Sequence, residues 1–240
     1  MPSLHVQGTE IEYRVLKTRR NRYIRLTVSG KDGVRVSAPW GVPAREVHEM
    51  VRERGDWILD RLEHFRELEQ RQPRWSFADG QRVLVMGEWR LLRVISWERN
   101  AGKVSLEENE VVIRVPFRLL GDEKVLGDLF YRWLRRWAEQ ELKRRIAILA
   151  EQMQMYPAKL SIRAQRSKWG SCNANGNITL NMRLMHAAGE VIDYVLIHEL
   201  AHLRELNHSS RFWQLVEKYS PNRRIHQAWL RDHSWMLEVR

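Results

Sequence analysis

The chain has 240 residues, of which 43% are apolar and 30% are charged, so it is long enough to bury a sizeable core. These proportions exclude a disordered or fibrous protein, and every apolar run is far shorter than the ~20 residues of a membrane-spanning helix. Lys and Arg outnumber Asp and Glu by 41 to 30, and the net charge of +11 favours polyanionic partners. The N-terminus has no basic segment followed by an apolar one, and a single cysteine excludes an internal disulfide. We therefore expect a cytoplasmic protein without membrane contact.

The first half of the chain is predicted to be mainly β-structure. Apolar and basic positions alternate over residues 11–28, and the alternation resumes after a turn signal that ends at Gly33, which predicts a hairpin. Pro43 begins a helical pattern, and residues 83–115 alternate again. We expect a β-rich N-terminal region with one helix over residues 1–120.

The second half is predicted to be mostly helical. A long helix is indicated over residues 122–154, short strands over residues 158–185, and further helices from about residue 190. The apolar positions that define the face of the long helix are Val125, Leu129, Trp133, Trp137, Leu142 and Ile146. We expect an α+β chain whose second region, residues 121–240, either folds separately or forms one continuous domain with the first. No internal repeat is visible in the sequence.

One segment carries metal-binding chemistry. Residues 191–208 read VIDYVLIHELAHLRELNH and contain the pattern H-E-x-x-H, which begins at His198 and ends at His202. The segment has no Gly or Pro, so a helix of about four turns can form, and residues four apart then share one face. Both imidazoles can therefore reach one ion. Glu199 is rotated by one position and can face a water on that ion without being a ligand.

A third ligand is needed, because catalytic zinc sites usually have three protein ligands and a water. His208 is predicted to be this ligand, since Asn207 can adopt a left-handed conformation that turns the chain back. One of the two serines that follow can then cap the next helix. Glu205 shares the face of the two motif histidines if the helix continues, but its Cα would lie about 4.5 Å beyond that of His202 along the axis. The more distant alternatives are Glu217 and Glu238.

The stretch before the metal motif is predicted to contain a turn and an edge strand. Residues 166–185 read RSKWGSCNANGNITLNMRLM, and the strand is expected over residues 176–184. Zinc peptidases commonly present such a strand beside the metal, where an extended peptide pairs with its main chain. An ordinary structural hairpin is the alternative.

Several segments together resemble the YgjP-like predicted metal-dependent hydrolases, which are related to the SprT and WLM metalloproteases. The resemblance covers almost the whole chain and rests on R-S-K-W-G-S-C, G-N-I-T-L-N, V-L-I-H-E-L-A-H-L and N-H-S-S-R-F-W. It implies a zincin-like metallopeptidase core with an H-E-x-x-H active-site helix. It also implies Zn²⁺ ligands at His198, His202 and His208, with Glu199 as general base.

The expected function is zinc-dependent hydrolysis of a peptide bond in a peptide or protein substrate, by a metal-activated water. Similar proteins are also described as UTP pyrophosphatases, so nucleotide pyrophosphohydrolysis at the same metal site is an alternative. Three histidines and the lack of a Gly-rich phosphate loop favour zinc and the peptidase. A nucleophilic Cys172 is a weaker alternative, because no histidine is indicated as its partner.

A nucleic-acid-associated protein is the remaining hypothesis. Basic residues cluster over residues 17–25, and further basic residues alternate with Trp133 and Trp137 on the helix from Arg132 to Arg145. The same helix pattern is also typical of a solvated face with aromatic anchors in the core.

Overall fold

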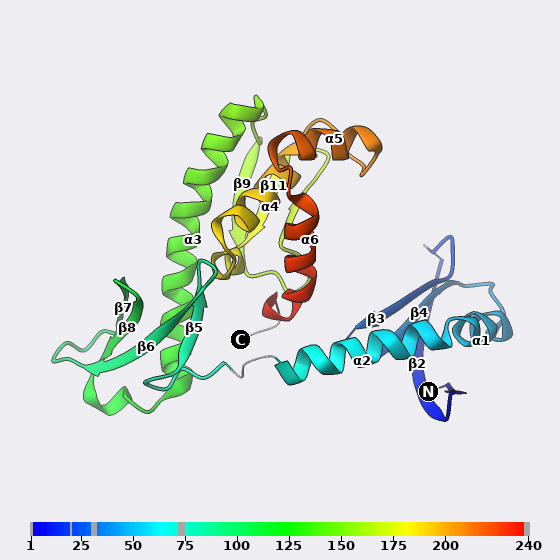
Figure 1. Cartoon of the computed structure of the whole chain (residues 1–240), viewed down its shortest axis with the longest axis horizontal. Helices are drawn as coiled ribbons and strands as arrows, with labels where there is room; N and C mark the ends of the chain where they lie inside the picture. The colour runs from blue at the N-terminus through cyan, green and yellow to red at the C-terminus, as the bar shows by residue number, and fades with distance from the viewer. Residues whose placement is uncertain (1, 20, 30–32, 72–74, 238–240) are drawn as a thin grey trace. The chain divides into compact units, whose positions relative to one another are not determined.

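The structure is a computed structural model that describes residues 2–19, 21–29, 33–71 and 75–237, with only the backbone described for residues 68–71. The chain divides into two units, Met1–Arg74 and Trp75–Arg240, and each unit begins with four β-strands that are followed by helix (Figure 1). The expected α+β class is confirmed. The boundary between the units precedes the one expected at residue 120, because the second group of strands shares its core with the long helix that follows.

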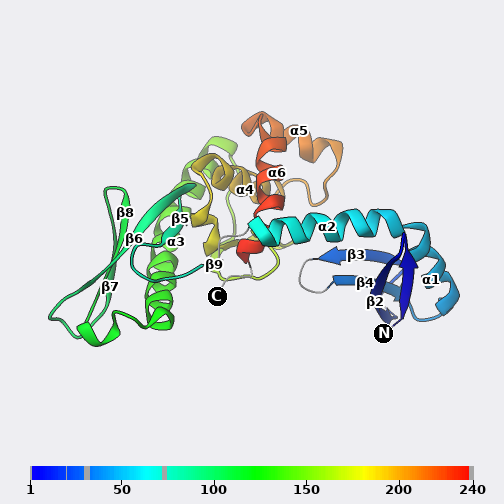
Figure 2. The same ribbon diagram turned by 60° about the horizontal axis from the view of Figure 1, so that its bottom comes forward.

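The first unit consists of a four-stranded sheet and two helices. The elements are β1 (Ser3–Val6), β2 (Thr9–Thr18), β3 (Arg25–Ser29), β4 (Gly33–Pro39), α1 (Ala44–Glu53) and α2 (Gly55–Arg71). The strand order is β1-β2-β4-β3, and the predicted hairpin is the antiparallel pair of β3 and β4. Strand residues such as Val36 and helix residues such as Val51 and Ile58 form one buried cluster, so the core lies between the sheet and the helices (Figure 2).

The prediction of a single helix in this region is wrong, because α1 ends at Glu53 and α2 begins at Gly55. A Cβ at Gly55 would lie only 2.7 Å from Cγ2 of Val6, so the chain at this position comes close to the first strand. Both helices direct apolar residues to the same core, so the spacing of apolar residues continues across the break.

The second unit contains seven strands and most of the helical residues of the described chain. Its first half comprises β5 (Arg82–Val85), β6 (Glu88–Ser96), β7 (Lys103–Glu107), β8 (Glu110–Val115), η1 (Phe117–Leu119) and α3 (Glu123–Met153). Its second half comprises β9 (Lys159–Arg163), β10 (Gly170–Cys172), β11 (Asn177–Asn181), η2 (Met182–His186), α4 (Gly189–Ala201), α5 (Ser210–Tyr219), α6 (Arg223–Asp232) and η3 (Ser234–Leu237). Helix α3 runs along both halves, with β7 and β8 beside its first part and α4 and β9 beside its second (Figure 1).

Helix α3 matches the predicted helix closely in length but not in its buried face. The Asp122 side chain accepts a hydrogen bond from the Val125 N–H at the start, and Gln154 ends the helix in a left-handed conformation. The fully buried stripe contains Leu126, Phe130, Leu134, Ala138, Leu142 and Ile146. The prediction of the buried face is therefore correct for Leu142 and Ile146. Trp133 and Trp137 each precede a residue of the buried stripe and are only half-buried.

The sheet next to α4 has three strands in the order β10-β11-β9. Residues 177–181 form the central strand of this sheet, and residues 182–186 form a 3₁₀ helix. The prediction of an edge strand over residues 176–184 is therefore wrong. The two edge strands of this sheet are β9 and the shorter β10, and β10 is the edge strand that contacts α4.

The strands of the two units repeat one topology that we did not detect in the sequence. In each unit an antiparallel hairpin is followed by a parallel pairing and a second antiparallel pairing, which gives the orders β1-β2-β4-β3 and β5-β6-β8-β7. The first hairpin of each unit turns through two residues with positive φ, Gln7-Gly8 and Met86-Gly87. The two units therefore share the order and direction of strand pairing and the type of the first turn.

No helix in the described ranges has both the length and the apolar character that crossing a membrane requires.

Candidate metal centre

Helix α4 carries the H-E-x-x-H pattern and is buried along most of its length. Leu196 and Leu200 face the core, and both have exposed fractions of 0%. The helix ends at Ala201, and the N–H groups of Leu203 and Arg204 donate to carbonyls three residues earlier. This tighter turn directs the following chain back toward the helix.

The left-handed conformation predicted for Asn207 is wrong. The described residues other than glycine with positive φ are Gln7, Met86, Glu108 and Gln154. The reversal begins instead in residues 202–205, where the His202 Nδ1–H donates to the Glu205 carbonyl at 3.0 Å. The predicted cap of the next helix is confirmed at Ser209, whose side chain accepts from the Phe212 N–H.

Three imidazoles meet at the end of α4. One ring nitrogen from each of His198, His202 and His208 lies within 4.8 Å of the other two, and the Nε2 atoms of His198 and His208 are 3.1 Å apart. The ligand nitrogens of a tetrahedral ion at about 2.1 Å are separated by about 3.4 Å. The three histidines that the sequence predicted as ligands are therefore close enough to converge on one ion.

Aromatic side chains of α5 hold these imidazoles in place. The ring of Phe212 stacks on His202 with centroids 4.5 Å apart, and the ring of Trp213 stacks on His208 at 5.4 Å. Since Nδ1 of His202 is engaged with the Glu205 carbonyl, its Nε2 is left for a metal. The helix after the turn thus fixes the orientation of the ligand set.

Two buried polar atoms in this part of the described chain have no hydrogen-bond partner, namely Nδ1 of His198 and Oε2 of Glu199. Such atoms are unfavourable in a protein interior unless a bound ion, water or substrate satisfies them. Three imidazoles are the donor set that suits borderline transition-metal ions better than hard ions such as Mg²⁺. The residues therefore fit a divalent transition-metal ion.

Burial sets the protonation of the site. Burial, together with the neighbouring His202 and His208, lowers the pKa of His198 to about 3, and burial also lowers the pKa of His202. These two imidazoles are neutral near pH 7 and have a lone pair for a metal. Burial raises the pKa of Glu199 to about 8, against the opposing effect of the positive charge on Lys168.

Glu199 lies beside an open hollow of about 230 Å³ next to the imidazoles. The hollow is lined by Lys168, Trp169, Gly170, Tyr194, Val195, His198, Glu199 and Leu230. A Cβ at Gly170 would lie 2.6 Å from Oε1 of Glu199, so the carboxyl group packs directly against the backbone of β10. The edge strand and the glutamate thus border the same space.

The other candidate residues are not part of the cluster of imidazoles. Glu205 contributes its backbone carbonyl to His202, and Glu217 forms an ion pair of 2.8 Å with Arg223. Glu238 lies outside the described residues. Cys172 is on β10, but burial and the nearby Glu199 raise the pKa of its thiol, which is the opposite of nucleophile activation.

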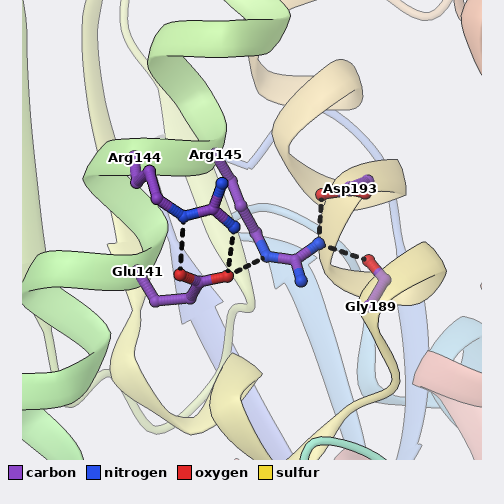
Figure 3. A network of polar contacts seen from close by, with 5 residues as sticks. All are labelled: Glu141, Arg144, Arg145, Gly189 and Asp193. Atoms are coloured by element: carbon purple, nitrogen blue, oxygen red, sulfur yellow. Dashed lines mark hydrogen bonds and ion pairs between the residues drawn. The ribbon is translucent and has the colours of Figure 1, made fainter.

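A network of charged residues joins α3 to the first turns of α4 (Figure 3). Arg145 donates from Nε to Glu141 at 2.7 Å, and from Nη1 to Asp193 at 2.9 Å and to the Gly189 carbonyl at 3.4 Å. Arg144 binds the same Glu141 carboxylate. This network connects α4, which carries His198 and Glu199 and ends just before His202, to α3, the longest helix of the unit.

The sequence interpretation missed Gly170, Phe212 and Trp213. Gly170 has no side chain, and its role follows only from the approach of Glu199. The two aromatic residues belong to the segment N-H-S-S-R-F-W, so their position just after His208 was a usable signal.

An α+β unit in which one helix and its C-cap present two histidines and a buried glutamate, with a third histidine beside them, has the make-up of a metal-dependent hydrolase. The model of the YgjP-like metallopeptidase domain matches residues 22–233, and the chain belongs to this family. The family assignment confirms the resemblance read from the four sequence segments.

Among solved structures, the chain is similar to the metallopeptidase zymogen abylysin of Pyrococcus abyssi. The two are 28% identical, the match covers 37% of this chain and 90% of abylysin, and the TM-score is 0.35. The comparison with curated proteins gives no match.

Proposed function

We propose that this protein is a zinc-dependent peptidase whose ligands are His198, His202 and His208 and whose general base is Glu199. The observation that carries the proposal is the convergence of three imidazoles within 4.8 Å beside a buried carboxyl group with an unpartnered oxygen. Among divalent ions, zinc is the usual choice of catalytic sites built from such ligands and a glutamate base.

Glu199 performs the proton transfers in this mechanism. Zinc, when bound, supplies the positive charge that favours the ionised glutamate, acidifies a water and polarises the scissile carbonyl. Glu199 accepts the proton of the attacking water and delivers it to the leaving amine. The backbone of Gly170 limits where the carboxylate can lie and so directs it into the hollow.

Strand β10 is the candidate binding site for the substrate backbone. It has a free edge and borders the hollow through Gly170, so an extended peptide can pair with it by main-chain hydrogen bonds. An extended, unfolded segment of polypeptide is therefore the expected substrate form.

The test compares wild-type protein with Glu199→Gln, both stripped with a chelator and reloaded with one equivalent of zinc. Wild-type protein is expected to cleave a quenched-fluorescent peptide library. The variant is expected to cleave it at least about 100-fold more slowly, because the side-chain amide of glutamine cannot accept the proton of the water. Equal zinc content in both proteins is the control. Cleavage that survives the substitution would exclude Glu199 as the general base. Hydrolysis of UTP without any peptide cleavage would show that the protein is a nucleotide pyrophosphohydrolase and not a peptidase.

A further inference from the structure

A second hollow, of about 380 Å³, lies on the first half of α3. It is lined by Leu106 of β7 and by four residues of α3, namely Trp133, Arg136, Trp137 and Gln140. Strand β7 is an edge strand of its sheet and runs beside this part of α3 (Figure 1). None of the five lining residues borders the hollow at the metal centre, so this is a separate feature of the second unit.

The two tryptophans provide an aromatic wall. They are one helical turn apart, with ring centroids separated by 5.2 Å and planes inclined by 39°. Both pack on the edge of the core, yet the stripe through Phe130, Leu134 and Ala138 already fills the interior beside them. The indoles therefore keep surface that lines the hollow and is accessible to a planar ligand.

The charge at this hollow is positive. Neighbouring arginines on α3 are bound to carboxylates: Arg135 pairs with Glu139 at 3.3 Å, and Arg144 pairs with Glu141 at 2.8 Å. Within the described part of the chain, Arg136 is exposed and has no such partner. Its guanidinium is the charged group among the five lining residues, and none of the five is an anion.

We propose that this hollow binds single-stranded nucleic acid, with an unpaired base against Trp133 and Trp137 and the adjoining phosphate at Arg136. Aromatic faces bind unpaired bases of any sequence, and an unpaired guanidinium is suited to a phosphate. The net charge of +11 attracts a polyanionic strand more strongly than a free nucleotide. The hollow is open to solvent between an edge strand and a helix, which a continuous strand can cross.

The test uses the full-length, zinc-loaded protein and a fluorescein-labelled single-stranded 12-mer, followed by fluorescence anisotropy at low salt. Arg136→Glu is expected to weaken binding at least about tenfold. The matched control is Arg118→Glu, an exposed arginine of the same unit that does not line the hollow and that gives the same change in net charge. The control is expected to weaken binding no more than about threefold, because it changes only the long-range field.

A second variant tests the aromatic contact. Trp137→Leu retains an apolar side chain on α3 and is expected to weaken binding about tenfold, since one stacked base contributes about 1–3 kcal/mol. Circular dichroism and thermal unfolding show whether the variant is folded. Peptide cleavage by Arg136→Glu is expected to equal that of wild-type protein, because the hollow is separate from the metal centre.

Four results overturn the proposal. They are the absence of binding by wild-type protein, an equal loss in Arg136→Glu and Arg118→Glu, equally tight binding of the duplex form of the same 12-mer, and full competition by an equal concentration of a mononucleotide. The third result excludes base stacking, and the fourth assigns the hollow to free nucleotides.

Discussion

The carboxyl group of Glu199 packs against the backbone of β10 at Gly170 and lines the same hollow as His198. A Cβ added at Gly170 would lie 2.6 Å from Oε1 of Glu199. The other carboxyl oxygen, Oε2, is buried and has no hydrogen-bond partner. Spacing alone was enough to predict His198, Glu199 and His202 as candidate site residues. The requirement for glycine at position 170 could not be predicted from the sequence, because it depends on the contact between two segments that are separated along the chain.

Gly170→Ala is expected to reduce peptide cleavage by about 10- to 100-fold while leaving zinc content unchanged. The added methyl group displaces the Glu199 carboxyl group from the hollow, and misplacement of a catalytic group by about 1 Å costs about that factor. Steady-state kinetics and metal analysis on the same samples measure both quantities. Ser171→Ala, at the next position of β10, is the control and should retain activity; wild-type activity in Gly170→Ala would contradict the role of this contact.

His186 gives the second unit a pH-dependent stability. Its ring is buried, the Nδ1–H donates to the Leu84 carbonyl at 2.7 Å, and burial lowers its pKa to about 4. An unfolded histidine titrates near pH 6.5, so the unfolded state binds more protons between these values and the protein loses stability as the pH falls from about 6.5 to 4. The loss attributable to this residue is roughly 3 kcal/mol.

Urea unfolding of the zinc-free protein at pH 7 and at pH 4 measures this effect. His186→Gln is expected to show a smaller change in unfolding free energy between the two pH values than wild-type protein. An identical change in both proteins would show that other groups account for the acid sensitivity.

At the scale of elements, α4 is held by the aromatic residues of α5 and by the ion pairs to α3. The Arg145 side chain is only 19% exposed and binds both Glu141 and Asp193, whereas the Arg135–Glu139 pair is 62% and 42% exposed. Exposed pairs contribute little to stability because solvent screens them, and buried charged hydrogen bonds contribute more. The two arginines of α3 are therefore expected to differ when they are replaced.

Arg145→Gln is expected to lower the free energy of unfolding by about 1–3 kcal/mol, because Asp193 then loses its hydrogen-bonded partner. Arg135→Gln is the matched control and is expected to change it by less than about 0.5 kcal/mol. Chemical denaturation of the zinc-loaded proteins measures both values. Equal effects of the two substitutions would mean that the network of Figure 3 does not hold α4 in place.

The existence of the elements was easier to predict than their faces and neighbours. The helix expected over residues 122–154 is α3 (Glu123–Met153), because apolar residues recur at helical spacing along its whole length. The tryptophans of α3 were placed on the core face since apolar residues occur at two adjacent positions of each turn there. Burial of the 126–130–134 stripe instead depends on the strands that cover it, which the local sequence does not specify.

The order of the strands in the sheet could not be predicted from the sequence either. The segment around residue 180 has the alternation of a half-buried strand, and that pattern does not distinguish the central β11 from an edge. Likewise, the break between α1 and α2 lies where the apolar spacing continues, so periodicity gave no sign of it.

At the scale of the whole molecule, the chain consists of two units that begin with the same order of strands. The larger hydrophobic cluster contains residues from Phe77 onward, and the three candidate metal ligands lie in the same unit. The second unit therefore has its own core and its own complete candidate site. The expected division at residue 120 would separate strands β5–β8 from α3, whose buried residues belong to the same hydrophobic cluster.

A fragment of residues 75–240 is expected to unfold cooperatively and to bind one zinc ion with the affinity of the full chain. Thermal unfolding followed by circular dichroism, with and without zinc, measures both properties. A fragment that shows no cooperative transition would mean that residues 1–74 complete the fold of the second unit.

Metal content tests most directly whether His198, His202 and His208 hold one zinc ion. The protein is purified without a histidine tag or chelator and analysed for metals beside His208→Ala and Glu205→Ala. About one zinc per chain is expected in wild-type protein and in Glu205→Ala, and a loss of zinc is expected in His208→Ala. No zinc in the wild-type protein, or full zinc content in His208→Ala, would rule out a zinc site with these three ligands.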